Sequence, residues 1–376
     1  MNPQTEAANA ARQSEIPPEA RELADSVGRD YERRQKEAAE SHERAVSRVV
    51  EEARAEIHDL LGPETLRTLR SLKRRELTAL QERLQPPGGP TRNFDDENRA
   101  RKSRLDRFLG ERGIAPARLN EIARTHFAQA RALVELDRST LGEAIAMRFH
   151  GGVFHTWVGA EGVIADPHRF FVFEPPFDGG QTGFSVSRSP QAYRVAVNRE
   201  VALDLDAGLV GHTLFLDIID ASDVDLAHGI ADTQVAFWFQ APVTGLVEIL
   251  IEAQSGLATH DLSVEDEWGW SDSDTRQNNF LMMHVLHPNV TAPSFAPMSD
   301  FFAATDDTNS YHHEFLTRGG DFAARLFSDG PVSANQWMVI RAGTRSDDWT
   351  MTNDMEIHSA SRFQWFIKRV HVRIAP

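Results

Sequence analysis

The chain has 376 residues, which exceeds the usual size of one hydrophobic core, so two or three domains are expected. It contains no cysteine, which excludes disulfides, thiolate zinc sites and cysteine nucleophiles. Its 56 acidic and 40 basic residues give a net charge of −16, which argues against nucleic-acid binding because phosphate contacts need a basic surface.

Residues 1–28 contain Pro17 and Pro18 and are polar, so we expect a flexible leader. The first fifteen residues, MNPQTEAANAARQSE, have neither the basic nor the apolar region of a secretory signal. The sequence also has no run of 18 apolar residues, so we expect no membrane span. These features favour a cytoplasmic location, or export without a general signal peptide.

Residues 29–90 are predicted to form a helical hairpin or stalk. The segment from Arg29 to Leu61 is rich in Ala, Glu and Arg, which are strong helix formers, and Gly62-Pro63 ends it. Leucines spaced three or four apart predict a second helix over 64–84. The Pro- and Gly-rich stretch that follows must break this helix.

Residues 91–150 are expected to form short helices that link the hairpin to the rest of the chain, one of them starting at Pro116. The apolar stripes of all these helices are narrow, and isolated helices are marginal in water, so they need a partner. Either they pack on the following domain, or copies of the chain associate as a coiled-coil-like, oligomerising stalk. The heptad repeat is not sustained, and the sequence does not decide whether 95–149 packs with the helices or with the following domain.

Residues 151–376 are acidic and aromatic: they hold 30 acidic against 13 basic residues and all seven Trp. Apolar residues alternate with polar ones over 193–206 and 246–253, which is typical of half-buried antiparallel strands. The last strand changes parity near Lys368-Arg369, where a β-bulge would keep both apolar sets in the core. The sequence therefore predicts an α+β multidomain protein, with a helical region followed by an antiparallel β-sandwich or jelly-roll-like domain.

The segment HDLSVEDEWGW, which begins at His260, is the first candidate site. Trp rings stack on sugars, carboxylates bind sugar hydroxyls, and clustered oxygens hold Ca²⁺. The alternative is a solvated acidic loop whose Trp side chains pack back on the core. The candidate ligand-binding residues are Asp266, Glu267, Trp268, Trp270, Asp272 and Asp274.

His312 and Glu314 are the second candidate site. Two residues apart on a strand, they would share a face and supply two ligands to a divalent cation. A complete site needs three or four ligands, so ordinary surface and core histidines are the alternative.

No catalytic motif is present: there is no Gly-x-Ser-x-Gly elbow, no Walker A loop and no His-Glu-x-x-His. The β part is similar, in general texture, to the sandwich domains of bacterial and phage surface-binding proteins. We therefore expect a non-enzymatic structural or binding protein, in which the helices drive assembly or docking and the sandwich presents a ligand or subunit surface. A glycan is the expected ligand, and a homo-oligomer or larger protein assembly the expected state. The alternatives are a glycan-acting hydrolase that uses loop carboxylates and an exported effector or toxin.

Overall fold

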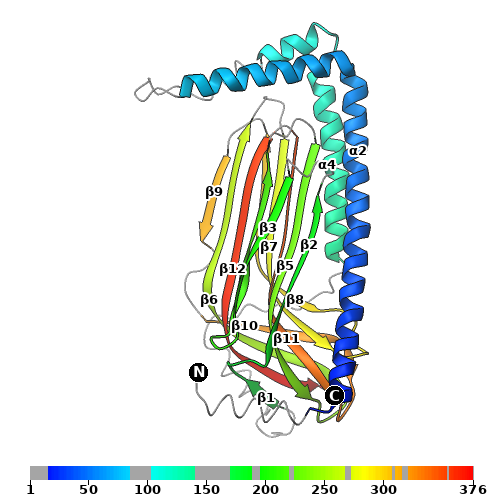
Figure 1. Cartoon of the computed structure of the whole chain (residues 1–376), viewed down its shortest axis with the longest axis vertical. Helices are drawn as coiled ribbons and strands as arrows, with labels where there is room; N and C mark the ends of the chain where they lie inside the picture. The colour runs from blue at the N-terminus through cyan, green and yellow to red at the C-terminus, as the bar shows by residue number, and fades with distance from the viewer. Residues whose placement is uncertain are drawn as a thin grey trace.

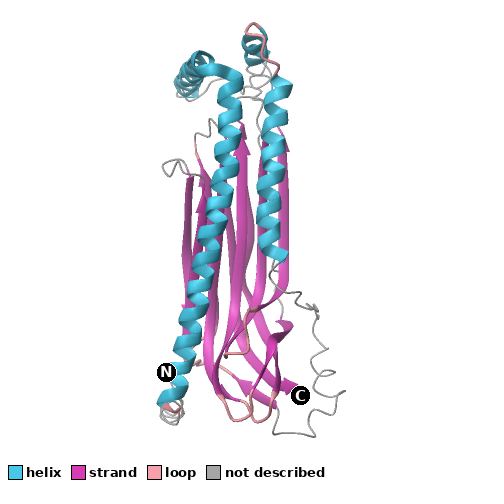
Figure 2. Ribbon diagram, turned by 90° about the vertical axis from the view of Figure 1, so that its right-hand side faces the viewer, coloured by secondary structure: helices cyan, strands magenta, loops and turns pink. Residues whose placement is uncertain are grey.

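The protein consists of a helical region followed by an antiparallel β-sandwich, as the sequence predicts (Figures 1 and 2). The computed structural model describes residues 16–84, 103–139, 170–188, 195–219, 224–266, 272–306, 310–315, 321–353 and 355–375.

The longest element is helix α2, Pro18–Leu84, which runs along the sandwich and then turns across one end of it (Figure 1). It begins at Pro18 rather than at Arg29, because proline fits the first helical turn and the following turns have apolar partners on the sheet. The turn occurs at Gly62, whose φ of 72° lies in the left-handed region and interrupts the helix before Pro63. No described helix has an apolar stretch long enough to cross a membrane.

Helix α4, Pro116–Ser139, lies beside α2 and shares its apolar cluster. Val50 and Ile57 of α2 are buried in this cluster with Leu119 of α4 and with Trp349 of the sandwich. The helical stripe is therefore covered within the chain, by α4 and by the sheet, and α4 contacts both neighbours.

Twelve strands are described, in two sheets. Sheet A has the order β10-β6-β12-β4-β3, with β1 paired to β12 and β9 paired to β6, and sheet B has the order β2-β5-β11-β7-β8. The strands of sheet A are β1 Phe170–Phe173, β3 Val195–Asp204, β4 Leu209–Ile218, β6 Gly245–Asp266, β9 Ser310–Phe315, β10 Asp321–Val332 and β12 Met355–Ala375. Those of sheet B are β2 Gly179–Arg188, β5 Val224–Gln240, β7 Asp272–Leu286, β8 Ser294–Asp306 and β11 Trp337–Asn353.

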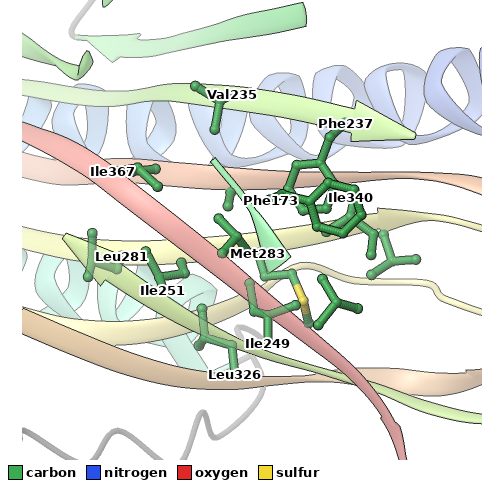
Figure 3. Packing of buried hydrophobic residues seen from close by; sticks show 14 of the residues in the cluster. Phe173, Val235, Phe237, Ile249, Ile251, Leu281, Met283, Leu326, Ile340 and Ile367 are labelled. Carbon is green, nitrogen blue, oxygen red and sulfur yellow. The ribbon is translucent and has the colours of Figure 1, made fainter. Parts of the chain in front are cut away.

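The lower half of the sandwich has an apolar core, in which Phe173 stacks on Phe237 with ring centroids 4.1 Å apart (Figure 3). The predicted β-bulge in β12 is confirmed: the register with β6 shifts between Ile367 and Arg369. Ile367 before the shift and Val370 after it are both fully buried, so the bulge keeps the apolar side chains facing inward.

The middle of the sandwich is polar, although it is buried. His212 Nε2 lies 2.7 Å from Ser346 Oγ, which in turn donates to Asn279 Oδ1. Burial lowers the pKa of His212 to about 3, with a smaller effect from the positive charge of Arg199, so this histidine is neutral. The lower core and a second apolar cluster above it are thus separated by a polar layer, in which hydrogen bonds between the two sheets take the place of apolar packing.

Candidate functional site

Much of the outer face of sheet B is covered, because α2 packs on β2, β5, β7 and β11, and α4 packs on β7 (Figure 2). Sheet A lies on the side of the sandwich away from these helices (Figure 1). Along most of β12, buried side chains alternate with half-buried or exposed ones, as expected for a strand with one face in the core and one in solvent. The outer face of sheet A is therefore the surface on which the sandwich can present a ligand site.

Edge strand β9 presents two aromatic side chains on this face. Tyr311 is 77% exposed and Phe315 is 60% exposed, the two highest values among the large hydrophobic side chains of the described residues. His313 lies between them and contacts Phe315 edge-on, with ring centroids 5.0 Å apart. We call Tyr311, His313 and Phe315 the β9 platform.

Hydrogen-bonding groups surround the β9 platform. His313 Nδ1 is hydrogen-bonded to Asp261 of β6, and Asp261 also accepts a 3.0 Å hydrogen bond from Thr259 Oγ1. The strand registers extend one row of outward-facing residues from Tyr311 across Ser263 to His358. Aromatic faces and polar groups thus alternate over a surface three strands wide.

His358 of β12 lies at the far side of this surface. Its Nδ1 lies 3.0 Å from Asp217 Oδ1 and its Nε2 lies 3.1 Å from Glu356 Oε1. Burial alone would lower the pKa of His358, but the hydrogen bonds to the two carboxylates and their negative charges outweigh it and raise this pKa. His358 therefore keeps its proton to a higher pH than an isolated histidine does.

His312 and Glu314, the predicted cation ligands, share the opposite face of β9. His312 Nε2 is 3.5 Å from Glu314 Oε2, and the His312 ring stacks on Phe301 at a centroid distance of 4.0 Å. Within the part of the chain that the structure describes, no group of three or more His, Asp or Glu is arranged to hold a metal. The cation site at these two residues remains a prediction.

The predicted loop site lies at the junction of β6 and β7. Asp266 ends β6, Asp272 begins β7, and Asp274 is 9% exposed on β7. Glu267, Trp268 and Trp270 lie outside the described residues. Ligand or Ca²⁺ binding by this loop therefore also remains a prediction.

A hydrolase would need two carboxylates converging in one open cleft. Among the described residues, Asp347 and Asp348 are buried carboxyls with shifted pKa, and they are adjacent residues of β11 that point to opposite faces of sheet B. Burial, and to a lesser degree the charge of Asp347, raises the pKa of Asp348 well above its usual value, and its side chain is fully buried. This pair has no shared cleft in which a glycan could lie.

A hollow of about 400 Å³ lies beside the bulge of β12 and is lined by Glu174, Pro175, Glu252, Lys368 and Arg369. Arg369 Nε is 2.5 Å from Glu174 Oε1, so charges in this hollow neutralise one another. The hollow is polar and lacks an aromatic lining, unlike the β9 platform.

The sequence pattern around His312 predicts a metal site and does not by itself predict the β9 platform. The signal was present, since Tyr311, His313 and Phe315 form an alternating row of rings in the same six residues. Only the exposure of the rings, which depends on β9 being an edge strand, distinguishes this row from a core-facing one.

No family model and no curated protein matches this chain. Solved structures with weak similarity include the family 11 carbohydrate-binding module from Clostridium thermocellum, in complex with a β-1,3-1,4-mixed-linked tetrasaccharide. It is 8% identical with a TM-score of 0.15, and the match covers 50% of this chain and 96% of the module. The enzymatically active domain of bacteriophage CBA120 tailspike protein 4 is 7% identical with a TM-score of 0.12, over 50% of this chain and 18% of that one. A structure titled "CBM4 structure and function" is 8% identical with a TM-score of 0.11, and the match covers 47% of this chain and 86% of that one. Similarity this low assigns no function.

Proposed function

We propose that this protein is a glycan-binding protein, and that its β9 platform is the site at which sugar rings stack. The observation that carries the proposal is the exposure of Tyr311 and Phe315, 77% and 60%, on one face of a six-residue edge strand. Exposed large aromatics that share a face are candidates for binding because their apolar faces gain from losing contact with water.

The spacing and the neighbours of these rings fit a sugar chain. Tyr311 and Phe315 are four residues apart on a strand, which is about 13 Å at 3.3 Å per residue, so two rings of one glycan can each contact an aromatic. Asp261 and His313 lie between them and can bind sugar hydroxyl groups.

The helical pair supports the platform from the opposite side of the molecule. Its apolar face is buried on sheet B, so sheet A stays uncovered. In this proposal the helices stabilise the sandwich by packing on sheet B. Assembly of several copies through the helices remains a separate expectation, and glycan binding does not depend on it.

The test is calorimetric titration with a panel of neutral gluco-, xylo- and manno-oligosaccharides. We expect binding by the wild-type chain and at least a fivefold loss of affinity for Tyr311→Ala and for Phe315→Ala, which corresponds to about 1 kcal/mol per ring. Phe302→Ala is the matched control, because Phe302 is a 46% exposed aromatic on β8 of sheet B. Binding that is equally weakened in all three variants, or unchanged in the two β9 variants, would refute the proposal.

A further inference from the structure

Two arginines of β11 face helix α2 from the outer side of sheet B. Arg341 and Arg345 are four residues apart on one strand and share this face. On the helix, Gly28 lies next to Arg341, since a Cβ built on it would be 3.8 Å from Arg341 Nη2. Tyr31 lies one turn further along α2 and contacts His284 of β7 at a ring distance of 4.1 Å. Between the sheet and the helix, Arg345 is therefore buried and Arg341 is half-buried.

These arginines have no hydrogen-bonded partner among the described residues. Arg345 is 5% exposed, and its Nε is buried without a hydrogen-bond partner. Across the described residues, neither Arg341 nor Arg345 forms a hydrogen bond or an ion pair. Arg345 has a cation–π contact with Phe295 at 5.1 Å, and its charge also acts on Asp347 and Tyr31. Burial lowers the pKa of Arg341, and this effect exceeds the attraction of Glu32, Asp232 and Tyr31. Buried arginines are rare unless they are paired, because an unpaired buried charge is costly.

Three other enclosed arginines among the described residues form ion pairs. Arg54 Nη2 lies 2.8 Å from Asp225 Oδ1, where α2 meets β5. Arg325 and Arg373 both bind the buried carboxylate of Glu248 on sheet A. Arg341 and Arg345 depart from this pattern.

The acidic groups nearest to the two arginines already bind other side chains. Asp347 binds His228 at 2.8 Å, Asp232 accepts a 2.5 Å hydrogen bond from Gln234, and Glu32 accepts a 2.9 Å hydrogen bond from Gln181. Arg34 of α2 is also near this region: burial, followed by the positive charges of Arg341 and Arg34, lowers the pKa of His284, so His284 itself is neutral. The negative charges of Glu32, Asp232 and Asp347 therefore act on the two arginines. Among the described residues none of these carboxylates hydrogen-bonds either guanidinium group, so the N–H donors remain available to an added anion.

Solvent reaches the helix above this region. All residues of α2 from 32 to 38 are exposed, including Gln35 and Ala38, which share a helix face with Tyr31 and His42. Because these two side chains lie on the sheet-facing side and still remain exposed, the helix does not seal against the sheet here. A small solute can therefore approach from this side.

We propose that Arg341 and Arg345 form a binding site for an oxyanion, the carboxylate, phosphate or sulfate group of a small molecule, between α2 and sheet B. Guanidinium groups bind such groups with two parallel hydrogen bonds, and two of them on one strand face can hold one anion together. The bound anion would accept the hydrogen bonds that the two guanidinium groups do not make within the protein, and it would join the sheet to the helix. This site is independent of glycan binding on sheet A.

The test is thermal unfolding of the full chain in chloride buffer, with inorganic phosphate, sulfate or acetate added at constant ionic strength. We expect a saturable rise in Tm with at least one of the three anions, because a ligand that binds the folded state alone stabilises it. Arg345→Met and Arg341→Met are expected to abolish the saturable rise. Arg33→Met is the matched control and keeps it, because Arg33 lies on α2 with its side chain 62% exposed and paired with Asp30.

A second comparison separates a ligand site from a structural role. Without an oxyanion, Arg345→Met should unfold at the wild-type Tm or above it, because the substitution removes a buried N–H donor that has no hydrogen-bond partner. Arg345→Lys keeps the charge but not the planar fork, so its affinity for the anion should fall at least tenfold. An anion-dependent rise that survives in both methionine variants, or that Arg33→Met also loses, overturns the proposal. So does a Tm of Arg345→Met well below wild type in chloride alone.

Discussion

Replacing His284 by Phe tests whether protonation of this histidine destabilises the contact between α2 and sheet B at acidic pH. His284 is 2% exposed on β7, its ring packs on Tyr31 of α2, and its Nδ1 is buried without a hydrogen-bond partner. Burial, followed by the positive charges of Arg341 and Arg34, lowers the pKa of His284 from 6.5 to about 3. Phe keeps the ring contact and removes the nitrogen that has no partner.

The sign and size of the effect follow from the two pKa values. Because the pKa in the folded state is below that in the unfolded state, protonation favours unfolding, and stability is lost as the pH falls from 6.5 towards 3. At pH 5 this one group lowers the free energy of unfolding by about 2 kcal/mol relative to pH 7.5. At pH 7.5 the His284→Phe variant should lie within about 1 kcal/mol of wild type.

Urea unfolding of both proteins at pH 7.5 and pH 5 measures this difference. We expect His284→Phe to lose about 2 kcal/mol less than wild type between the two pH values. His358→Gln is the control of opposite sign: the pKa of His358 is raised, so its stabilising effect is present at acidic pH and lost as the pH rises. That control should lose stability mainly at pH 5, by less than about 1 kcal/mol because the side chain is half exposed. Equal pH dependence of wild type and His284→Phe would refute the reasoning.

Two further predictions concern the contact of α2 with β5 and the turn beside β12. Arg54→Met leaves the buried Asp225 carboxylate without this partner and should lower the free energy of unfolding by about 3–5 kcal/mol, whereas the double variant Arg54→Met/Asp225→Leu should recover part of this loss in the same urea assay. If the double variant is as unstable as the single one, the ion pair is not the cause. Gly208→Ala should lose about 1–3 kcal/mol, because Gly208 has a φ of 69° and a Cβ there would lie 2.3 Å from the Ile367 carbonyl oxygen. The control Gly110→Ala, which meets nothing within 4 Å, should be neutral or stabilising by up to about 1 kcal/mol, and equal losses in the two would contradict the role of strain.

The sequence predicted the parts of the fold that depend on local periodicity. The change of parity in β12 is an example, because a bulge at Lys368 is the simplest way to keep Trp365 and Val372 both inside, and both are buried. Strand β11 shows why other parts were missed. Its segment from Thr344 to Thr352 is polar on alternate positions and still buried throughout, because its partners come from strands far away in the sequence. No local pattern distinguishes such a strand from a loop.

The candidate site was predictable to a similar degree. Alternation placed His312 and Glu314 on one face of a strand, which is confirmed. It could not show that Tyr311 and Phe315 would be exposed, since exposure depends on the uncovered face of sheet A. Nor could it show that Arg345 would be enclosed by α2, which precedes it by some 300 residues.

Hydrogen exchange of the full chain, with and without a bound neutral oligosaccharide, tests the location of the glycan site most directly. Our account predicts slower exchange in β9, Ser310–Phe315, and in the paired part of β6 over residues 259–264, with no change in α2. Protection that is confined to other strands or to the helices, with β9 unchanged, would contradict it.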